Sequence, residues 1–525
     1  MKLLEKIFSN LREDSSAPWI HEVHGNHVHT CTKAAFSDLI HTARQSLAEF
    51  GIRKGDRVVL LGPNSTQWIA CDLAIISMGA ITVPLYNRQE SAELAFMSED
   101  CQPALFIHAT DDLKKDVLKH WSSACQTTLL VDMFKPISQP QTDATNDAAK
   151  TATIIYTSGT SGHPKGVMLT GNSIDFMIER TTNQLYQAKG NREANDRVFH
   201  FLPLCFAGSR MMLWTQLFRN NPVYLSTDLK NLVQEMQTAA PEFYLNVPAI
   251  LERIRSGVEA KIHEKGGIVL WLYQHPMLSK LILPSIRKKI GKNLRFLICG
   301  SAALHPDTQK WFNTLGINIL QVYGLTETTA IITMDEPGHV QTGFVGTPIP
   351  GVEIKLSAEG ELLTKGPNLF EGYWNRGKEF DECFVGGWFK TGDLAEISPA
   401  GNVRISGRIK NVIIPTSGHN IVPEPIEELL QKNCTKINHA VLIGHGKPYL
   451  SIIVTGDVSS NEIEKAISDI NQNVPHYRKI KTYLHHKDGF TVENGLLTAN
   501  QKIKRRAVET TLHPQIEKMY TQVQL

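Results

Sequence analysis

The sequence is poor in cysteine and in net charge. Eight cysteines are spread over 525 residues and no two stand at CxxC spacing, so neither a disulfide framework nor a zinc-cluster pattern is present. We therefore expect reduced thiols, as in a cytoplasmic protein. Lysine and arginine number 54 against 52 aspartates and glutamates, a net charge of +2. This balance argues against nucleic acid as a partner, because phosphate binding needs clustered positive charge.

Long hydrophobic runs are also missing. The longest apolar stretch, residues 73–85, is interrupted by Ser77, Thr82 and Pro84, and it is too short to span a bilayer. The N-terminal residues MKLLEK lack the continuous apolar core of a signal peptide. At 42% hydrophobic and 20% charged residues, the composition is that of a globular enzyme and excludes a disordered or fibrous chain.

The pattern of short apolar runs predicts an α/β fold with largely parallel sheets. Helical spacing covers residues 36–50, and Ser65 is expected to cap a second helix. Buried strands are expected at residues 58–61, 105–107, 129–131, 154–156, 243–245 and 296–298. Glycine and proline become frequent after residue 335, which predicts a β-rich subdomain with strands at 352–356, 361–364 and 403–406. Residues 135–150 are polar and read as a surface linker.

A loop rich in glycine and hydroxyl groups follows the strand at 154–156. Its residues are Tyr156, Thr157, Ser158, Gly159, Thr160, Ser161, Gly162, His163, Pro164, Lys165 and Gly166. Hydroxyl donors, flexible glycines and one lysine suit a loop that wraps a polyphosphate. It is not a GxxxxGK[ST] P-loop, because Pro164 stands where the second glycine belongs and Gly166 replaces the final hydroxyl. The alternative, a flexible linker, does not account for the ending Pro-Lys-Gly after a buried strand.

This loop resembles the phosphate loop of the adenylate-forming superfamily, which includes acyl-CoA synthetases, luciferases and peptide-synthetase adenylation domains. Four further motifs follow in the order of that family: YGLTET at 323–328, GWFKTGD at 387–393, SGRIK at 406–410 with GHNIVP at 418–423, and LTANQKIKRR at 497–506. Five motifs in order, over most of the chain, are a specific signal.

The resemblance implies roles for the residues of these motifs. Lys502 is expected to contact the carboxylate and the α-phosphate, two groups that repel each other without a cation. Glu327 is the implied Mg²⁺ ligand and Thr326 the hydrogen-bond donor to the α-phosphate. Tyr323 would stack on adenine, and Asp393, with Arg408 beside it, would accept hydrogen bonds from the ribose. The remaining implied nucleotide-binding residues are Thr157, Ser158, Gly159, Thr160, Ser161, Gly162, Lys165, Gly300, Ser301, Ala302 and Gly324.

Three of these assignments have plain structural alternatives. Lys502 could belong to a solvated basic face with Lys504, Arg505 and Arg506. Tyr323 could be a core aromatic at the end of a strand. The Thr-Gly-Asp sequence that ends at Asp393 could be an ordinary turn.

The resemblance also implies a domain organisation. An N-terminal adenylation domain, residues 1–407 with two α/β subdomains and a β-rich one, precedes a hinge at 408–411 and a mobile α+β C-terminal domain at 412–525. Lys410 occupies the hinge position, and Asn411 replaces the acidic residue common after it. Domain alternation about such a hinge would bring Lys502 to the site for adenylation and later open a channel for a thiol.

Long-chain fatty acyl-CoA synthetases are the subfamily that the chain resembles most, over residues 201–204 and 246–253. The expected reaction is ATP-dependent conversion of a fatty acid to acyl-AMP, with ATP, Mg²⁺ and CoA required. Phe206 and Gly418 are expected on the acyl and CoA side, and Cys205-Phe206 replaces the histidine usual after Leu-Pro-Leu. Two alternatives remain: a ligase with a non-CoA acceptor, such as a carrier protein, and an inactive nucleotide-binding regulator.

Two further patterns lie outside these motifs. Residues 20–30 predict a hairpin turning at Gly25-Asn26, with Glu22, His24, His27 and His29 on one face, as either a metal site or an exposed polar face. Apolar stripes stand at residues 3–11 and 268–286, the second running into Arg-Lys-Lys at 287–289. Each stripe predicts either peripheral contact with a membrane surface or packing onto the protein's own body.

Overall fold

The computed structural model describes residues 1–121, 125–136, 150–157, 164–192, 195–226, 229–498 and 502–521. The chain divides into two compact units. The first unit is Met1–Ile354, Thr364–Phe389 and Ile397–Val403, and the second is Lys355–Leu363, Lys390–Glu396 and Arg404–Leu525. Helices alternate with mostly parallel strands through the first 330 residues, which confirms the α/β prediction.

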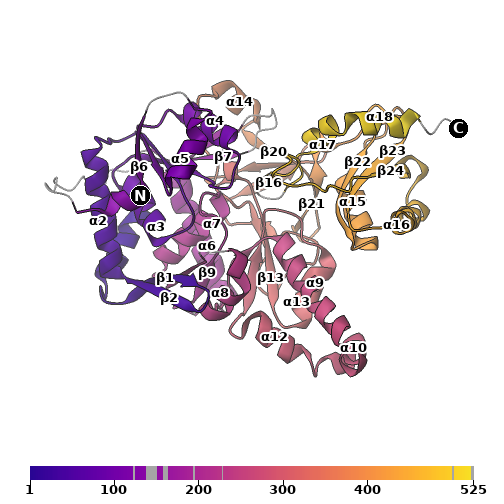
Figure 1. Cartoon of the computed structure of the whole chain (residues 1–525), viewed down its shortest axis with the longest axis horizontal. Helices are drawn as coiled ribbons and strands as arrows, with labels where there is room; N and C mark the ends of the chain where they lie inside the picture. Colours follow the sequence, from indigo (N-terminus) through magenta and orange to yellow (C-terminus); the bar gives the residue numbers. More distant parts are fainter. Residues whose placement is uncertain are drawn as a thin grey trace. The chain divides into compact units, whose positions relative to one another are not determined.

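A seven-stranded sheet forms the core of the N-terminal region, in the order β18-β8-β7-β4-β3-β5-β6 (Figure 1). Its strands are β3 (Arg57–Leu61), β4 (Ile81–Leu85), β5 (Leu105–His108), β6 (Gln126–Leu129), β7 (Thr151–Thr157), β8 (Lys165–Thr170) and β18 (Gly372–Tyr373). Within this order, the five strands β7, β4, β3, β5 and β6 run parallel to one another. β8 is antiparallel to β7, and β18 is antiparallel to β8. Buried Val and Leu residues fill β3, as expected for a strand covered on both faces.

Two helices beside this sheet cover the predicted segments, although the first begins three residues earlier than the predicted 36–50. These are α2 (Lys33–Glu49) and α3 (Thr66–Ser77). The Ser65 hydroxyl accepts a hydrogen bond from the backbone N–H of Trp68 at 3.0 Å, which caps α3. The strand expected over residues 129–131 is only partly correct. β6 ends at Leu129 and a 3-10 helix, η1 (Leu130–Phe134), follows, because that turn buries Leu130 and Met133 together.

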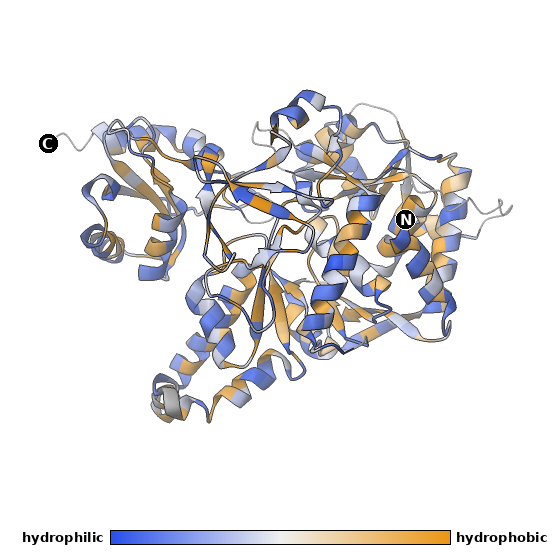
Figure 2. Ribbon diagram, turned by 180° about the vertical axis from the view of Figure 1, so that it is seen from behind, coloured by the Kyte–Doolittle hydropathy of each residue, from blue (hydrophilic) through white to orange (hydrophobic). Residues whose placement is uncertain are grey.

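Two smaller sheets belong to the first unit. One has the order β2-β1-β10-β9, with β1 (Pro18–His24), β2 (His27–Thr32), β9 (Val198–His200) and β10 (Val223–Ser226). The other has the order β11-β12-β13-β14-β15, with β11 (Leu245–Asn246), β12 (Phe296–Cys299), β13 (Asn318–Tyr323), β14 (Thr333–Met334) and β15 (Thr347–Pro348). Figure 2 shows hydrophobic residues on the central strands of the second of these sheets, where β12 is buried along its whole length. Phe243, expected within a strand, makes only an isolated bridge to Val198.

The β-rich region predicted after residue 335 is present. It forms the order β16-β17-β20-β19, with β21 beside β20. The strands are β16 (Glu353–Leu356), β17 (Glu361–Lys365), β19 (Phe384–Val385), β20 (Trp388–Ile397) and β21 (Val403–Arg408). A separate sheet of the second unit, β22-β23-β24, consists of β22 (Ile437–Ile443), β23 (Leu450–Gly456) and β24 (Ile480–His485). The helices α15 (Glu424–Asn433), α16 (Ser460–Gln472), α17 (Arg505–Thr511) and α18 (His513–Thr521) accompany it.

The first apolar stripe is buried inside the protein. It lies on α1 (Lys2–Arg12), where Leu3, Leu4, Ile7 and Leu11 are each at most 3% exposed. The helix contacts α2, α6 (Gly171–Ala188) and α7 (Ala207–Phe218). The backbone N–H groups of Lys2 and Leu3 donate to the Asp175 carboxylate of α6. Of the two interpretations of this stripe, packing onto the protein's own body is therefore the correct one.

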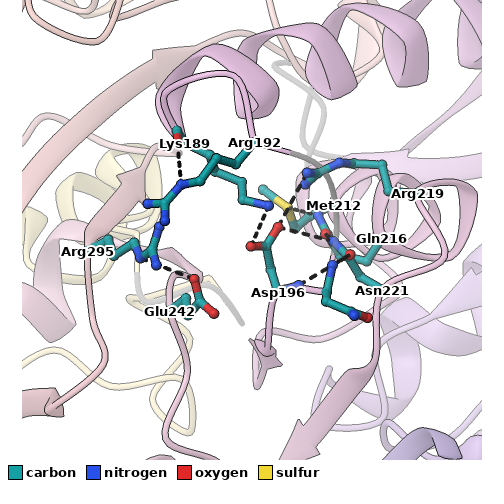
Figure 3. A network of polar contacts seen from close by, with 10 residues as sticks. Lys189, Arg192, Asp196, Met212, Gln216, Arg219, Asn221, Glu242 and Arg295 are labelled. Carbon is teal, nitrogen blue, oxygen red and sulfur yellow. Dashed lines mark hydrogen bonds and ion pairs between the residues drawn. The ribbon is translucent and has the colours of Figure 1, made fainter.

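A buried polar network ties the ends of α6 and α7 together (Figure 3). Asp196 accepts contacts from Lys189 at 2.6 Å and Arg219 at 3.3 Å, and all three side chains are buried. Asn221 joins the network by donating to Gln216 at 2.8 Å. A buried carboxylate with two cationic partners satisfies its charge, so this network fixes α7 without any residue of the predicted site.

The remaining described α-helices belong to the first unit. They are α4 (Ser91–Cys101), α5 (Asp111–Leu118), α8 (Leu232–Ala239), α9 (Pro248–Lys265), α10 (Gly267–Gln274), α11 (Pro276–Ser279), α12 (Leu283–Gly291), α13 (Pro306–Thr314) and α14 (Gly377–Glu382). Among the described residues, no helix combines the length and the hydrophobicity that crossing a membrane requires. All eight cysteines are free thiols, and five of them are buried.

Candidate active site

Two segments of the predicted site leave neighbouring strands at the same edge of a sheet. β12 and β13 run parallel, with Cys299 opposite Gln321, so Gly300–Ala302 and Tyr323–Thr326 both follow carboxyl ends. A Cβ on Gly300 would lie 2.6 Å from Val322 Cγ2 and 3.0 Å from its carbonyl oxygen. Only glycine fits there, and the carboxyl edge of a parallel sheet is where ligands bind in α/β proteins.

The segment after Tyr323 makes a tight turn that exposes polar groups. Gly324 approaches the backbone so closely that a Cβ would stand 2.2 Å from the Ala330 carbonyl oxygen. The short helix η3 (Thr326–Thr328) follows, with the N–H of Leu325 donating to the Thr328 hydroxyl at 2.9 Å. Tyr323, Thr326 and Glu327 are all half-buried.

The Glu327 carboxylate is held by an aromatic neighbour. The Tyr373 hydroxyl donates to Glu327 Oε1 at 2.8 Å, and Lys165 Nζ lies 5.2 Å from the centre of the Tyr373 ring. We call Lys165, Glu327 and Tyr373 the first-unit cluster. Burial, and then the negative charge of Glu327, raise the pKa of Tyr373, so its hydroxyl stays protonated and remains a donor. Sequence reasoning found Lys165 and Glu327 but missed Tyr373.

The base of the phosphate loop is fixed at both sides. Thr157 and Lys165 face each other at the end of the β7–β8 pair, while Ser158, Gly159, Thr160, Ser161 and Gly162 lie outside the described residues. The Tyr156 hydroxyl donates to Asp100 at 2.6 Å, and Arg376 contacts the other oxygen of Asp100 at 2.9 Å. Asp100 and Arg376 thus anchor the strand that leads into the loop, a role that the sequence did not signal.

Phe206 stands at the start of α7. Its ring lies 5.4 Å from that of Tyr86, centre to centre. The preceding Cys205 is buried, and burial raises the pKa of its thiol. The structure therefore places an aromatic pair and an un-ionised thiol where the resemblance predicts the acyl side, without a histidine at either position.

A second group of predicted residues meets in the second unit. Asp393 lies within β20 and is buried, and Arg408 Nε contacts its Oδ1 at 2.8 Å. The neighbouring Gly392 N–H donates to Glu361 Oε1 at 2.8 Å. Residues 391–393 are thus part of a ten-residue strand, and the alternative of an ordinary turn is wrong.

Lys502 completes this group, which we call the second-unit cluster: Asp393, Arg408 and Lys502. The Lys502 backbone N–H donates to the Thr498 hydroxyl at 3.0 Å, and its carbonyl accepts from the Thr498 N–H at 2.7 Å. Partial desolvation by the surrounding protein atoms, and then the positive charge of Arg408, lower the pKa of Lys502. Asp393 opposes this shift.

Of the basic residues next to Lys502, Arg505 does not belong to a solvated face, whereas Lys502 and Arg506 are exposed. Arg505 is mostly buried and makes two hydrogen bonds to the Glu427 carboxylate, at 2.7 and 2.8 Å. Glu427 belongs to α15, and Arg505 also donates to the Leu442 carbonyl of β22 at 3.2 Å. The segment after Lys502 is therefore fastened to the core of the second unit.

The predicted hinge and thiol-side residues are exposed. Lys410 lies in η4 (Ile409–Asn411), where desolvation and then Arg408 and Arg506 lower its pKa. Asn411 donates to Glu424 at 2.6 Å, so the residue that replaces the usual acidic one is itself bound to a carboxylate. Gly418 has φ +77° and open space around its α-carbon, and its role stays a prediction.

The N-terminal hairpin has the predicted register. Glu22 faces His29 and His24 faces His27 across β1 and β2. Glu22 is engaged elsewhere, accepting from the Thr66 N–H at 2.6 Å, and the described part of the chain holds no group of three side chains placed to bind a metal. On the other face, His21 stacks on Tyr224, and burial and then Arg197 lower its pKa to about 4. The bond of Glu22 to Thr66 supports the interpretation of the first face as an exposed polar face.

Comparison with known proteins identifies the family of the chain. A family model described as AMP-binding enzyme matches residues 17–374, and one described as AMP-binding enzyme C-terminal domain matches residues 410–524. Because the first match covers more than half of the sequence, the chain belongs to the AMP-binding enzyme family.

Individual proteins are similar along much of the chain. The long-chain-fatty-acid–CoA ligase FadD15 of Mycobacterium bovis is 27% identical, over 94% of this chain and 92% of that protein. Long-chain-fatty-acid–CoA ligase 4 of Saccharomyces cerevisiae is 30% identical, over 70% of this chain and 61% of that protein. The structure of o-succinylbenzoate coenzyme A synthetase from Bacillus subtilis, in complex with ATP and magnesium ion, has a TM-score of 0.77 at 20% identity, covering 95% and 98% of the two chains. This last likeness confirms the fold.

Proposed function

We propose that the protein is an AMP-forming fatty acyl-CoA synthetase. The carboxylate of a medium- or long-chain fatty acid attacks the α-phosphorus of ATP and releases pyrophosphate. The thiol of CoA then attacks the acyl-AMP, giving acyl-CoA and AMP. The observation that carries this proposal is the similarity to FadD15 over nearly the full length of both chains.

The first-unit cluster suits the phosphate end of ATP. Glu327 offers a carboxylate to Mg²⁺, which prefers such oxygens together with phosphates and water, and its partner Tyr373 is a neutral donor that leaves the charge intact. A bound Mg²⁺ would neutralise charge on the phosphates. Lys165 and the Thr326 hydroxyl are the protein's own donors to phosphate oxygens, and Tyr323 offers a flat face to adenine.

The second-unit cluster suits the ribose and the reacting centre. Asp393 accepts hydrogen bonds from ribose hydroxyls, with Arg408 holding its orientation. Lys502 supplies the positive charge that draws the carboxylate to the α-phosphate and stabilises the charge that develops there. No residue of the protein forms a covalent bond in either step.

The domain organisation remains part of the proposal. We place the adenylation domain at 1–407, the hinge at 408–411 with Lys410, and the C-terminal domain at 412–525. The exposed 3-10 turn at 409–411 supports this position, since a hinge needs a few residues with room to change their backbone angles. Phe206 and Gly418 are proposed for the acyl and CoA side. Contact with a membrane surface is a separate proposal.

One assay tests the function and its alternatives. Pyrophosphate release is measured across a fatty-acid series, with and without CoA, together with ATP–pyrophosphate exchange. We expect acid-dependent exchange and acyl-CoA when CoA is present. Acyl-AMP that accumulates regardless of CoA would instead identify a ligase with another acceptor. No exchange with any acid would identify a nucleotide-binding regulator.

A further inference from the structure

The second apolar stripe remains at the surface. None of the eight residues of α10 is buried. Ile268 is 76% exposed, Trp271 51% and, beyond α11, Leu281 69%. These are among the largest exposed fractions of any hydrophobic side chain described, in contrast to the stripe on α1. Figure 1 shows α10 and α12 at the end of the first unit farthest from β7.

The helix α10, which carries Ile268 and Trp271, is held in place by hydrogen bonds. The Tyr273 hydroxyl accepts a hydrogen bond from Trp311 Nε1 at 2.7 Å and donates to Glu259 Oε1 at 3.2 Å. Arg255 contacts the same carboxylate at 3.0 Å. One side of α10 is thus fastened to α9 and α13, so Ile268 and Trp271 are displayed by a fixed helix and not by a loose segment.

Positive charge surrounds the exposed apolar residues. Residues 260–294 contain seven lysines and arginines and a single glutamate, within a chain whose net charge is only +2. Arg287 donates to the carbonyls of Leu315, Gly316 and Leu294, which fixes α12. Lys280, Lys288 and Lys289 are exposed. The segment therefore combines large apolar side chains with an excess of exposed cations.

This combination favours one kind of partner. Two copies of the same surface would bring like charges together, which costs free energy at an interface. An anionic lipid surface meets both properties, because its headgroups attract lysine and its acyl boundary takes up Trp and aliphatic side chains. Tryptophan in particular prefers the membrane–water interface.

We propose that Ile268, Trp271, Lys280, Leu281, Lys288 and Lys289, the α10–α12 surface, dock this protein on an anionic lipid bilayer. The docking itself is independent of the reaction. Its purpose, collecting a fatty acid from the membrane, rests on the proposed function. Because binding needs both apolar insertion and charge, it weakens as salt rises.

Vesicle co-sedimentation of the full-length protein tests the docking. The vesicles are phosphatidylcholine alone, or phosphatidylcholine with about one third phosphatidylserine. We expect binding to the anionic vesicles only, reduced about tenfold or more by I268Q/W271Q/L281Q and likewise by K280Q/K288Q/K289Q. The controls V233Q and K6Q/K378Q change an equally exposed valine and two exposed lysines elsewhere in the first unit, and should bind as the wild type does.

Tryptophan fluorescence gives a second measurement. Anionic vesicles should shift the wild-type emission to the blue, and W271F should bind with most of the affinity while losing the shift. The proposal is overturned if the wild-type protein does not bind anionic vesicles, or if it binds neutral vesicles equally well. So does binding that survives both triple variants, or a self-association that those variants abolish. Acyl-CoA synthesis from a water-soluble medium-chain acid, without vesicles, should be unchanged in both triple variants, which separates failed docking from failed catalysis.

Discussion

The two clusters of the candidate site hold charge in different ways. In the first unit, the Glu327 carboxylate accepts a hydrogen bond from the Tyr373 phenol, and Lys165 lies over the ring of that phenol. In the second unit, Arg408 contacts the Asp393 carboxylate, and Lys502 lies near enough for the charges of both to affect its pKa. The first cluster joins a carboxylate to a neutral phenol, whereas the second places two cations near one carboxylate. In the proposed function, the first cluster serves the phosphate end of ATP and the second serves the ribose and the reacting centre.

The largest effect is expected from Lys502→Ala. Removing the main cation of the second-unit cluster should lower acyl-AMP formation about 10²- to 10³-fold, because that charge acts on the transition state of the first step. Conversion of supplied acyl-AMP and CoA to acyl-CoA should be nearly unchanged. The two half-reactions are measured separately, with Lys6→Ala as a control for an exposed lysine. Equal loss of both halves would contradict the assigned role.

The next effect is expected from Glu327→Gln. An amide is a weaker Mg²⁺ ligand than a carboxylate, so acyl-AMP formation should fall about 10²-fold and should be partly restored at high Mg²⁺. ATP–pyrophosphate exchange at increasing Mg²⁺ measures this. A decrease that is the same at every Mg²⁺ concentration would separate Glu327 from the metal.

A smaller effect should follow from Tyr373→Phe. This change removes the hydrogen bond to Glu327 and keeps the ring beneath Lys165. We expect about a tenfold higher Mg²⁺ requirement, as when a partner of a metal ligand is lost, with the maximal rate largely kept. The same Mg²⁺ titration gives the result. Tyr86→Phe removes a hydroxyl of an aromatic residue beside Phe206 and serves as the matched control, with no change in Mg²⁺ requirement.

The smallest effect, and the sharpest test of the second-unit cluster, is a pair of opposite pH shifts. Adenylation needs charged Lys502, so it is lost as pH rises through the pKa of that lysine. Arg408→Gln removes a charge that lowers this pKa, and should move the alkaline limb of the rate profile to higher pH. Asp393→Asn removes a charge that raises it, and should move the limb to lower pH. The profile is recorded at saturating ATP. Shifts in the same direction would show that the limb does not report Lys502.

Much of the site could be found in the sequence because its residues stand in short motifs. Lys502, Glu327 and Asp393 each lie in a run that the family pattern makes visible, and the cap at Ser65 and the buried strand β3 follow from local rules. Tyr373 could not be found in this way, since it reaches Glu327 from 46 residues away. Asp100 and Arg376 are 276 residues apart. Such contacts depend on which strands become neighbours, and no local pattern encodes that.

The two apolar stripes make the same point. Residues 3–11 and 268–286 have similar patterns, yet Ile7 is fully buried and Ile268 is 76% exposed. Asp175 caps the start of α1 and draws it onto α6, whereas α10 is fastened through Tyr273 with its most apolar side chains left outside. Burial was decided by tertiary partners that neither stripe contains.

The ion pair of Arg505 with Glu427 limits how Lys502 can move. It stands three residues after Lys502 and binds that segment to α15 and β22. Lys502 cannot be delivered or withdrawn by a loop that opens on its own, because displacing the segment would break a buried charge pair at a cost of about 3–5 kcal/mol. In the domain alternation that we propose, Lys502 therefore moves together with the folded second unit. Such a movement would take microseconds to milliseconds, as whole-domain motions do, and would be slower than the fluctuations of a surface loop.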